Sequence, residues 1–166
     1  METQLTQLIN QSEIERVVNR YFQALDEKQL DPEFLAGIFA PDARVVRPNG
    51  STLVGPRAIG ESHAHVLGHF HATQHIVGGF IVTSVGESDC RFRANLVAMH
   101  VWAEGQGDPD VDANENSFLA GGVLTGRVTL LANGWRIAEI ANDVVWRRGT
   151  GWRELLKLVP TAGDRR

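Results

Sequence analysis

The fold is decided by residues 117–147, which read SFLAGGVLTGRVTLLANGWRIAEIANDVVWR. Two extended apolar runs in this stretch, 117–131 and 135–147, flank the pair Asn133-Gly134. This dipeptide between apolar runs is a strong hairpin signal, because both of its residues adopt positive φ angles readily. Two more extended runs precede the hairpin, at 75–86 and 90–104, so we predict a meander of four long strands.

The residues before this meander have the periodicity of helices. Ser12 has a glutamate three residues later, the spacing of a capping box, and apolar residues then recur every three or four positions. A first helix is therefore predicted to begin near Ser12. A second is predicted to begin at Asp31-Pro32 and to stop near Pro41, and a third is predicted to follow Gly55-Pro56.

Three shorter features complete the prediction. Two short strands are expected at 43–48 and 52–55, on either side of the turn-prone pair Asn49-Gly50. A short helix is expected near the end of the chain, from Trp152 to Leu158. The pair Gly78-Gly79 is interpreted as a bulge that bends its strand.

Helices first and a strand meander afterwards favour an α+β fold, with the helices on one face of a curved sheet that encloses space for a small ligand. The chain of 166 residues fits a single domain over residues 1–166, with its core at about 12–158. We expect residues 161–166 to be frayed.

Composition excludes several classes of protein. The chain has 16 basic and 20 acidic residues and a formal charge of −4, which disfavours nucleic acid as a partner. No apolar run approaches the roughly 20 residues of a membrane span, and residues 1–4 lack the features of a secretory signal. We therefore expect a cytoplasmic protein with no membrane or nucleic-acid partner. The single cysteine, Cys90, excludes an intrachain disulfide and a multi-cysteine metal site.

Four of the six histidines form a dense tract, His63, His65, His69 and His71. Residues two apart on a helix point about 200° from each other, so this tract is a poor metal site, although His65 and His69 could meet. We interpret it as an ordinary helix-to-loop segment and expect no metal. No glycine-rich phosphate cradle is present either, so we expect no cofactor.

His100 is the most informative of the other residues. Strand alternation places it on the apolar, inward face with Leu96, Ala98 and Trp102. A buried imidazole needs a hydrogen-bond partner, so His100 is either a satisfied core histidine or part of a site.

Asp26 and His75 pose the same question. Asp26 lies on the flank of the apolar stripe of the first helix, where it is either solvated or buried and in need of a donor such as an inward histidine. His75 opens the first long strand and shares its face with Val77, Ile81 and Val85. A carboxylate–imidazole pair fixes the ring tautomer and prepares a general acid or base near neutral pH.

The order and spacing of several motifs, taken over residues 12–158, are similar to one family. The chain resembles SnoaL-like proteins of the nuclear-transport-factor-2-like superfamily, and within them the scytalone dehydratase branch. The motifs that carry the resemblance are Tyr21-Phe22-Gln23-Ala24-Leu25-Asp26, Ile38-Phe39-Ala40-Pro41-Asp42-Ala43, Gly55-Pro56-Arg57-Ala58-Ile59, Thr73-Gln74-His75-Ile76-Val77-Gly78-Gly79, His100, Asn133-Gly134-Trp135 and Trp146.

The resemblance implies a cone-like, curved mixed β-sheet packed with about three N-terminal helices around an apolar pocket. It implies that His75 is the proton-transferring base and that Asp26 and His100 pair and support it. Leu25 and Arg47 stand where the dehydratases have two tyrosines that hold a water against the substrate, and Thr125 stands for an asparagine of their pocket.

We also expect Tyr21 and Trp102 to line the pocket, because Tyr21 lies in the apolar stripe of the first helix and Trp102 shares the face of His100. Family habit implies a homo-oligomer, either a dimer or a trimer.

The leading functional hypothesis is a cofactor-independent acid/base enzyme for an apolar carbonyl compound such as a polyketide, terpenoid or steroid-like intermediate. Dehydration, isomerisation and cyclisation all begin with proton removal next to a carbonyl, so the reaction type stays open. An alternative is epoxide hydrolysis or epoxide-opening cyclisation through Asp26, Arg47 and Asp143. A second alternative is a non-catalytic ligand-binding or assembly module.

Overall fold

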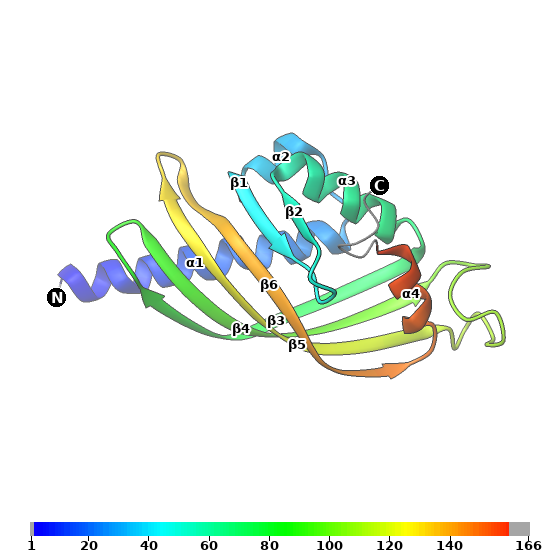
Figure 1. The fold of residues 1–166 in the computed structure, drawn as a ribbon. Helices are drawn as coiled ribbons and strands as arrows, with labels where there is room; N and C mark the ends of the chain where they lie inside the picture. The colour runs from blue at the N-terminus through cyan, green and yellow to red at the C-terminus, as the bar shows by residue number, and fades with distance from the viewer. Residues whose placement is uncertain (1, 160–166) are drawn as a thin grey trace.

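The computed structural model describes residues 2–159, which form a six-stranded sheet and four helices (Figure 1). In chain order the elements are α1 (Glu2–Asp26), α2 (Pro32–Ala36), β1 (Phe39–Val46), β2 (Thr52–Val54), α3 (Pro56–Leu67), β3 (Phe70–Ser84), β4 (Asp89–Trp102), β5 (Ser117–Leu131), β6 (Gly134–Gly149) and α4 (Trp152–Leu158). The α+β class is confirmed.

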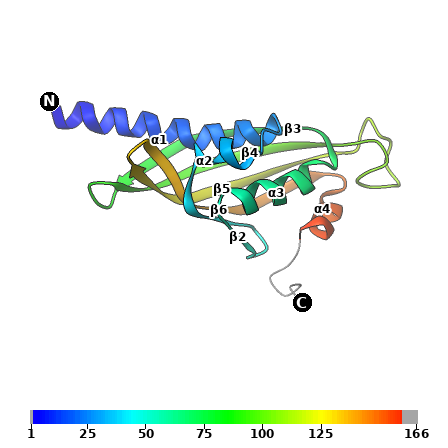
Figure 2. The same ribbon diagram turned by 90° about the horizontal axis from the view of Figure 1, so that it is seen from above.

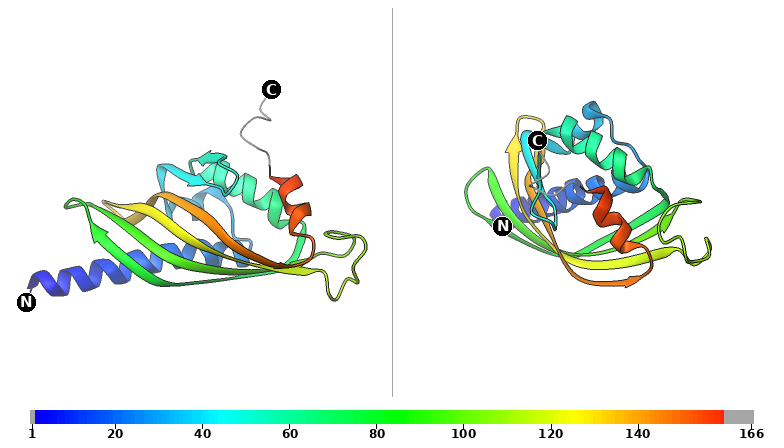
Figure 3. Two further views of the ribbon diagram at one scale, coloured as in Figure 1. Left: turned by 60° about the horizontal axis from the view of Figure 1, so that its bottom comes forward. Right: turned by 45° about the vertical axis from the view of Figure 1, so that its right-hand side comes forward.

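The sheet has the strand order β2-β1-β6-β5-β4-β3. β1 pairs with β6 in parallel, and all the other neighbours are antiparallel, so the sheet is mixed as the family resemblance implies. The four long strands bend together as one curved layer, and α2, α3 and α4 lie on the side toward which it curves (Figures 1 and 3). The predicted hairpin is present, because Leu131 pairs with Gly134 across the β5–β6 turn.

The first helix is longer than the sequence predicts. α1 begins at Glu2, ten residues before Ser12, so the capping-box interpretation is wrong and Ser12 lies inside the helix. Residues 2–11 are mostly glutamine, leucine and other helix-compatible residues, and propensity extends the helix without burial. The first turns project past the body of the molecule (Figure 2), which leaves Leu5 and Leu8 more than half exposed.

The short α2 has the predicted N-terminal cap. Asp31 accepts a hydrogen bond of 2.8 Å from the backbone N–H of Phe34, and Pro32 follows it. The helix ends at Ala36, before the predicted stop near Pro41, because the chain turns at Gly37 into β1. The helices α3 and α4 begin where the sequence predicts.

β3 begins at Phe70 and contains the predicted bulge. The register with β4 shifts between Gly78 and Ile81, and Gly79 has a φ of +66°, which glycine adopts without strain. The bulge reverses the alternation, so Ile81 is 60% exposed and does not share the inward face of His75 as predicted.

One continuous core joins the helices to the concave face of the sheet. It includes the fully buried side chains Ile14, Val18, Leu35, Ile38, Phe39, Ile59, Phe70, Phe118, Leu124, Val128 and Ile137. No helix within residues 2–159 is both long and apolar enough to cross a membrane. The frayed end predicted at 161–166 lies outside the described residues.

Candidate active site

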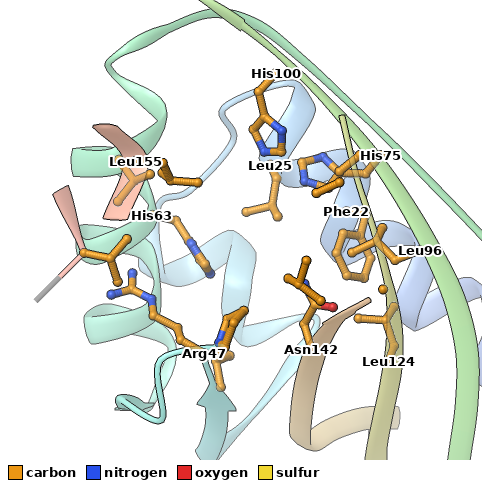
Figure 4. A pocket seen from close by; sticks show the side chains of 18 of the residues that line it. Phe22, Leu25, Arg47, His63, His75, Leu96, His100, Leu124, Asn142 and Leu155 are labelled. Atoms are coloured by element: carbon orange, nitrogen blue, oxygen red, sulfur yellow. The ribbon is translucent and has the colours of Figure 1, made fainter. Parts of the chain in front are cut away.

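A cavity of about 230 Å³ lies between the concave face of β4–β6 and the helices α1, α3 and α4 (Figure 4). This volume is somewhat below the roughly 300–1,000 Å³ typical of ligand pockets, so the cavity suits a small molecule. Its wall is mostly apolar and includes Phe22, Leu25, Val45, Leu67, Phe70, Leu96, Phe118, Leu124, Ile140 and Leu155.

His75 lines the cavity, and Asp26, which does not line it, forms a hydrogen-bonded pair with His75. Asp26 is the last residue of α1, and its Oδ1 lies 2.6 Å from Nδ1 of His75. The same carboxylate accepts a bond of 2.9 Å from the backbone N–H of His75 and one of 2.8 Å from the hydroxyl of Thr73. Thr73 and His75 are two apart on β3, so both side chains face the end of α1.

The surroundings keep this carboxyl ionised. Burial alone would raise the pKa of Asp26, but the hydrogen bonds from His75 and Thr73 and the attraction of the imidazole outweigh it and lower the pKa. An ionised Asp26 accepts the Nδ1–H of His75 and fixes the ring tautomer. The side chain of His75 is 7% exposed and lines the cavity.

His100 also lines the cavity, but its surroundings are different. Its ring is stacked on Phe118 with centroids 4.4 Å apart, and it meets the ring of His75 edge-on at 5.7 Å. Its Nδ1 is buried and has no hydrogen-bond partner within the described residues. Burial, helped by repulsion between the imidazolium forms of His75 and His100, lowers the pKa of His100 to about 3, so the ring of His100 is neutral at ordinary pH.

The pairing of Asp26 with His100 that the resemblance implies is therefore wrong for this structure. Asp26 binds His75 instead. In the β3–β4 register His100 lies opposite Thr73, and the hydroxyl of Thr73 donates to Oδ1 of Asp26, the same oxygen that binds Nδ1 of His75.

A second polar group lies on the α3 side of the cavity. The hydroxyl of Tyr21 is 2.7 Å from Nε2 of His63, and both residues line the cavity. Burial raises the pKa of Tyr21, and burial with the positive charge of Arg47 lowers the pKa of His63 to about 3. Both side chains are therefore neutral at ordinary pH.

His63 is a cavity residue that the sequence interpretation missed, because it belongs to the histidine tract, whose spacing indicates an ordinary helix-to-loop segment. The signal was present, since His63 is spaced four residues from Ile59 and four from Leu67, and both of those are buried. The other histidines of the tract do not form a metal site, because residues 2–159 contain no cluster of three metal-ligating side chains. The rings of His65 and His69 are in contact at 5.6 Å, without a third ligand among those residues.

Arg47 follows β1 and lines the cavity near α3. Its guanidinium donates a hydrogen bond of 2.6 Å to the hydroxyl of Ser62. Figure 4 shows it on the opposite side of the cavity from His75. Leu25 and Tyr21 line the cavity as well. The sequence analysis expects Arg47, Leu25 and Tyr21 at this cavity, and all three line it.

Two other predicted lining residues lie elsewhere. Thr125 is exposed, because side chains alternate along β5 and the inward position is taken by its neighbour Leu124. Trp102 is inward but lies beyond the cavity, where it is buried against Phe70 with ring centroids 4.4 Å apart. Both are corrections. Asn142 on β6, directly opposite Leu124, is an asparagine that does line the cavity, and the sequence interpretation missed it.

The arrangement suggested for epoxide chemistry is not assembled. Asp143 is exposed and does not line the cavity, because the alternation of β6 points Asn142 and Val144 inward. The carboxylate of Asp26 is already committed to His75 and Thr73.

Comparison with known proteins agrees with this description. Residues 6–141 match the model of the family described as the SnoaL-like domain. No curated protein sequence matches the chain significantly.

Several solved structures share the fold at low sequence identity. The Kfla4162 protein from Kribbella flavida has a TM-score of 0.75 and 19% identity, over 84% of this chain and 93% of its own. A hexachlorocyclohexane dehydrochlorinase, LinA type 3 from Novosphingobium barchaimii, has a TM-score of 0.73 and 17% identity, over 88% of this chain and 93% of its own. A proposed scytalone dehydratase from Novosphingobium aromaticivorans has a TM-score of 0.71 and 19% identity, over 97% of this chain and 98% of its own.

Proposed function

The chain belongs to the family of SnoaL-like domains, and on that premise we propose that it is a cofactor-independent acid/base enzyme for a small, mostly apolar carbonyl compound. The observation that carries the proposal is the Asp26–His75 pair, a carboxylate bonded to an imidazole at the wall of an apolar cavity. Two structural neighbours are named for eliminations, a dehydratase and a dehydrochlorinase. An elimination, an isomerisation and a ring closure can all begin with the same proton removal.

In the proposed reaction His75 is the base. Asp26 holds the proton on Nδ1, so the lone pair of Nε2 is available to take a proton from the carbon next to a substrate carbonyl. The electrons of the broken C–H bond form an enolate, and the imidazolium that results is stabilised by the negative carboxylate. The proton on Nε2 then goes to a leaving hydroxyl in a dehydration, or to another carbon in an isomerisation.

The rest of the cavity supports such a step. Its mostly apolar wall lowers the local dielectric constant, which strengthens the attraction between the imidazolium and Asp26. A positioned base contributes about 10²–10⁴-fold to a rate, so orientation of the substrate by this wall must supply the remainder. Polyketide, terpenoid and steroid-like intermediates are the apolar carbonyl compounds that we consider first.

The cavity also favours catalysis over a purely structural role. A non-catalytic module would be expected to fill this space with bulky side chains, whereas here a cavity remains and a carboxylate–imidazole pair lies at its wall. The carboxylate of Asp26 is paired with His75 and not with His100, and this pair provides a carboxylate–imidazole group for acid/base chemistry, as a pair with His100 would have done.

Deuterium exchange tests the proposal without knowledge of the natural substrate. A panel of cyclic ketones, including β-tetralone, is incubated in D₂O with the wild type, with His75→Ala and with a matched control, His71→Ala, which changes an exposed histidine of the same strand. We expect the wild type and the control to accelerate exchange next to the carbonyl, and His75→Ala to lose the acceleration. Equal acceleration by His75→Ala, or none by the wild type on any ketone, would refute the mechanism.

A further inference from the structure

The charged side chains that line the cavity are arginines. Two arginines, Arg47 and Arg147, line it, whereas no aspartate or glutamate among residues 2–159 does. This is unexpected in a chain with 20 acidic and 16 basic residues and a formal charge of −4. The arginines that line the cavity are therefore opposite in sign to the protein as a whole, and the carboxylate of Asp26, which does not line it, is bonded to His75.

Arg47 is the better placed of the two arginines. Its guanidinium donates to the hydroxyl of Ser62, and no carboxylate of the described residues lies within ion-pair distance of it. The nearest titratable side chains, Tyr21 and His63, are neutral. By contrast Arg44, three residues earlier, is exposed and lies 3.5 Å from the carboxylate of Glu139.

Arg147 lies on the same side of the cavity as α4. Its guanidinium is 5.3 Å from the ring centroid of Trp152, the first residue of that helix, and it also has no carboxylate partner in the part of the chain that the structure describes. The ring orients the charge without neutralising it.

A partly buried guanidinium without a counter-ion is costly to desolvate, and most of its five N–H donors are free to bind a ligand. Their planar geometry matches two oxygens of a carboxylate better than a single carbonyl oxygen. The apolar wall around them lowers the local dielectric constant and strengthens that attraction.

We propose that the substrate is a small apolar acid whose carboxylate is bound by Arg47 and attracted into the cavity by Arg147. This deepens the proposed function and rests on it, because it names the substrate class of the same cavity. Arg47 lies across the cavity from His75 (Figure 4), so the carboxylate is remote from the carbon that loses its proton. Arg47 is then a specificity-determining residue, and the apolar body of the acid lies between the two groups.

Binding of two matched probes tests this directly. Naphthoate and its uncharged analogue naphthamide are titrated by calorimetry into the wild type, Arg47→Gln, Arg47→Lys and the matched control Arg44→Gln. We expect the wild type to prefer naphthoate by at least about 10-fold, which is the usual size of a hydrogen bond to a charged group. Arg47→Gln should lose that preference and keep its affinity for naphthamide, and Arg47→Lys should retain part of it.

Two results would overturn the proposal. In the first, the wild type binds naphthoate no more tightly than naphthamide. In the second, Arg44→Gln loses the preference as fully as Arg47→Gln. Retained affinity for naphthamide shows that a variant is folded and its cavity intact.

The outcome is separable from that of the proposed chemistry. If the preference is found but no ketone exchanges deuterium, the acid site stands and the catalytic mechanism fails. If deuterium exchange depends on His75 but the probes bind equally, the mechanism stands and the substrate class is wrong.

Discussion

Replacing Asp26 with asparagine should invert the tautomer of His75. In the wild type the carboxylate accepts three hydrogen bonds, from Nδ1 of His75, from the backbone N–H of His75 and from the hydroxyl of Thr73. An asparagine has one oxygen, which must face the backbone N–H of His75, because that group can only donate. Its NH₂ group then faces Nδ1 and can only donate, so the ring must place its proton on Nε2.

The expected losses of rate and of stability follow from what the Asp26→Asn substitution removes. The lone pair of Nε2, which is the proposed base, is occupied by a proton, and the negative charge that stabilises the imidazolium is lost. Loss of a positioned base costs about 10²–10⁴-fold in rate, and the loss of orientation by a carboxylate falls in the same range. The free energy of unfolding should fall by about 1–3 kcal/mol, because a charge-assisted bond of 2.6 Å is replaced by a neutral one.

Two measurements check this reasoning. Long-range nitrogen–proton NMR of ¹⁵N-histidine-labelled protein reports which ring nitrogen of His75 carries the proton. Base-promoted ring opening of nitrobenzisoxazole, which needs only the removal of one proton, reports the rate. The matched control is Glu27→Gln, which neutralises the next residue, an exposed glutamate. If Nδ1 remains protonated in Asp26→Asn, or if the rate falls less than about 10-fold, the assigned role of Asp26 is wrong.

Three further predictions concern stability, each measured by urea unfolding. The pKa of His100 is about 3 in the folded chain and about 6.5 in the unfolded chain, so the unfolded chain binds the proton first as the pH drops. The free energy of unfolding therefore falls between pH 6.5 and pH 3. His100→Phe should reduce the slope of this fall by about 1 kcal/mol per pH unit. Tyr21→Phe should cost about 1 kcal/mol, because Nε2 of His63 loses its partner. Gly60→Ala should cost about 1–3 kcal/mol, because the added methyl group would collide with the backbone carbonyl of Leu30.

Each of these predictions has a result that would contradict it. An unchanged pH dependence in His100→Phe would mean that folding does not lower the pKa of His100. No loss in Tyr21→Phe would mean that another group, or water, already satisfies His63. A neutral Gly60→Ala would mean that α3 shifts away from the segment after α1 at no cost.

The fold was predictable from sequence because its main signals are local. The turn at Asn133-Gly134, the bulge at Gly78-Gly79 and the cap at Asp31 each arise from the conformational preferences of one or two residues, and all three are present. The start of α1 was not predictable in the same way. Ser12 is a good capping residue, but helix-forming residues precede it, and nothing local stops the helix there.

The site was only partly predictable, because it depends on which side chains meet across elements. Alternation correctly places His100 on the inward face, yet it cannot say whether the end of α1 lies closer to His75 or to His100. Alternation also gives Trp102 the correct face but not its distance along the strand, which takes it past the cavity. The inward direction of Asn142 was readable from its spacing to Ile140 and Val144, but a lone polar residue in a strand gives no sign that it reaches a cavity.

Three histidines line one cavity, and their different partners give them different roles. His75 has a carboxylate, His63 has a tyrosine hydroxyl, and Nδ1 of His100 has no hydrogen-bond partner within residues 2–159. Only the first arrangement stabilises a proton on the ring, because only Asp26 contributes a negative charge. His100 lies edge-on to His75 at 5.7 Å, so a charge on it would repel the proton that His75 accepts. Burial keeps His100 and His63 neutral, which leaves His75 as the base and the arginines as the positive charge that a substrate meets.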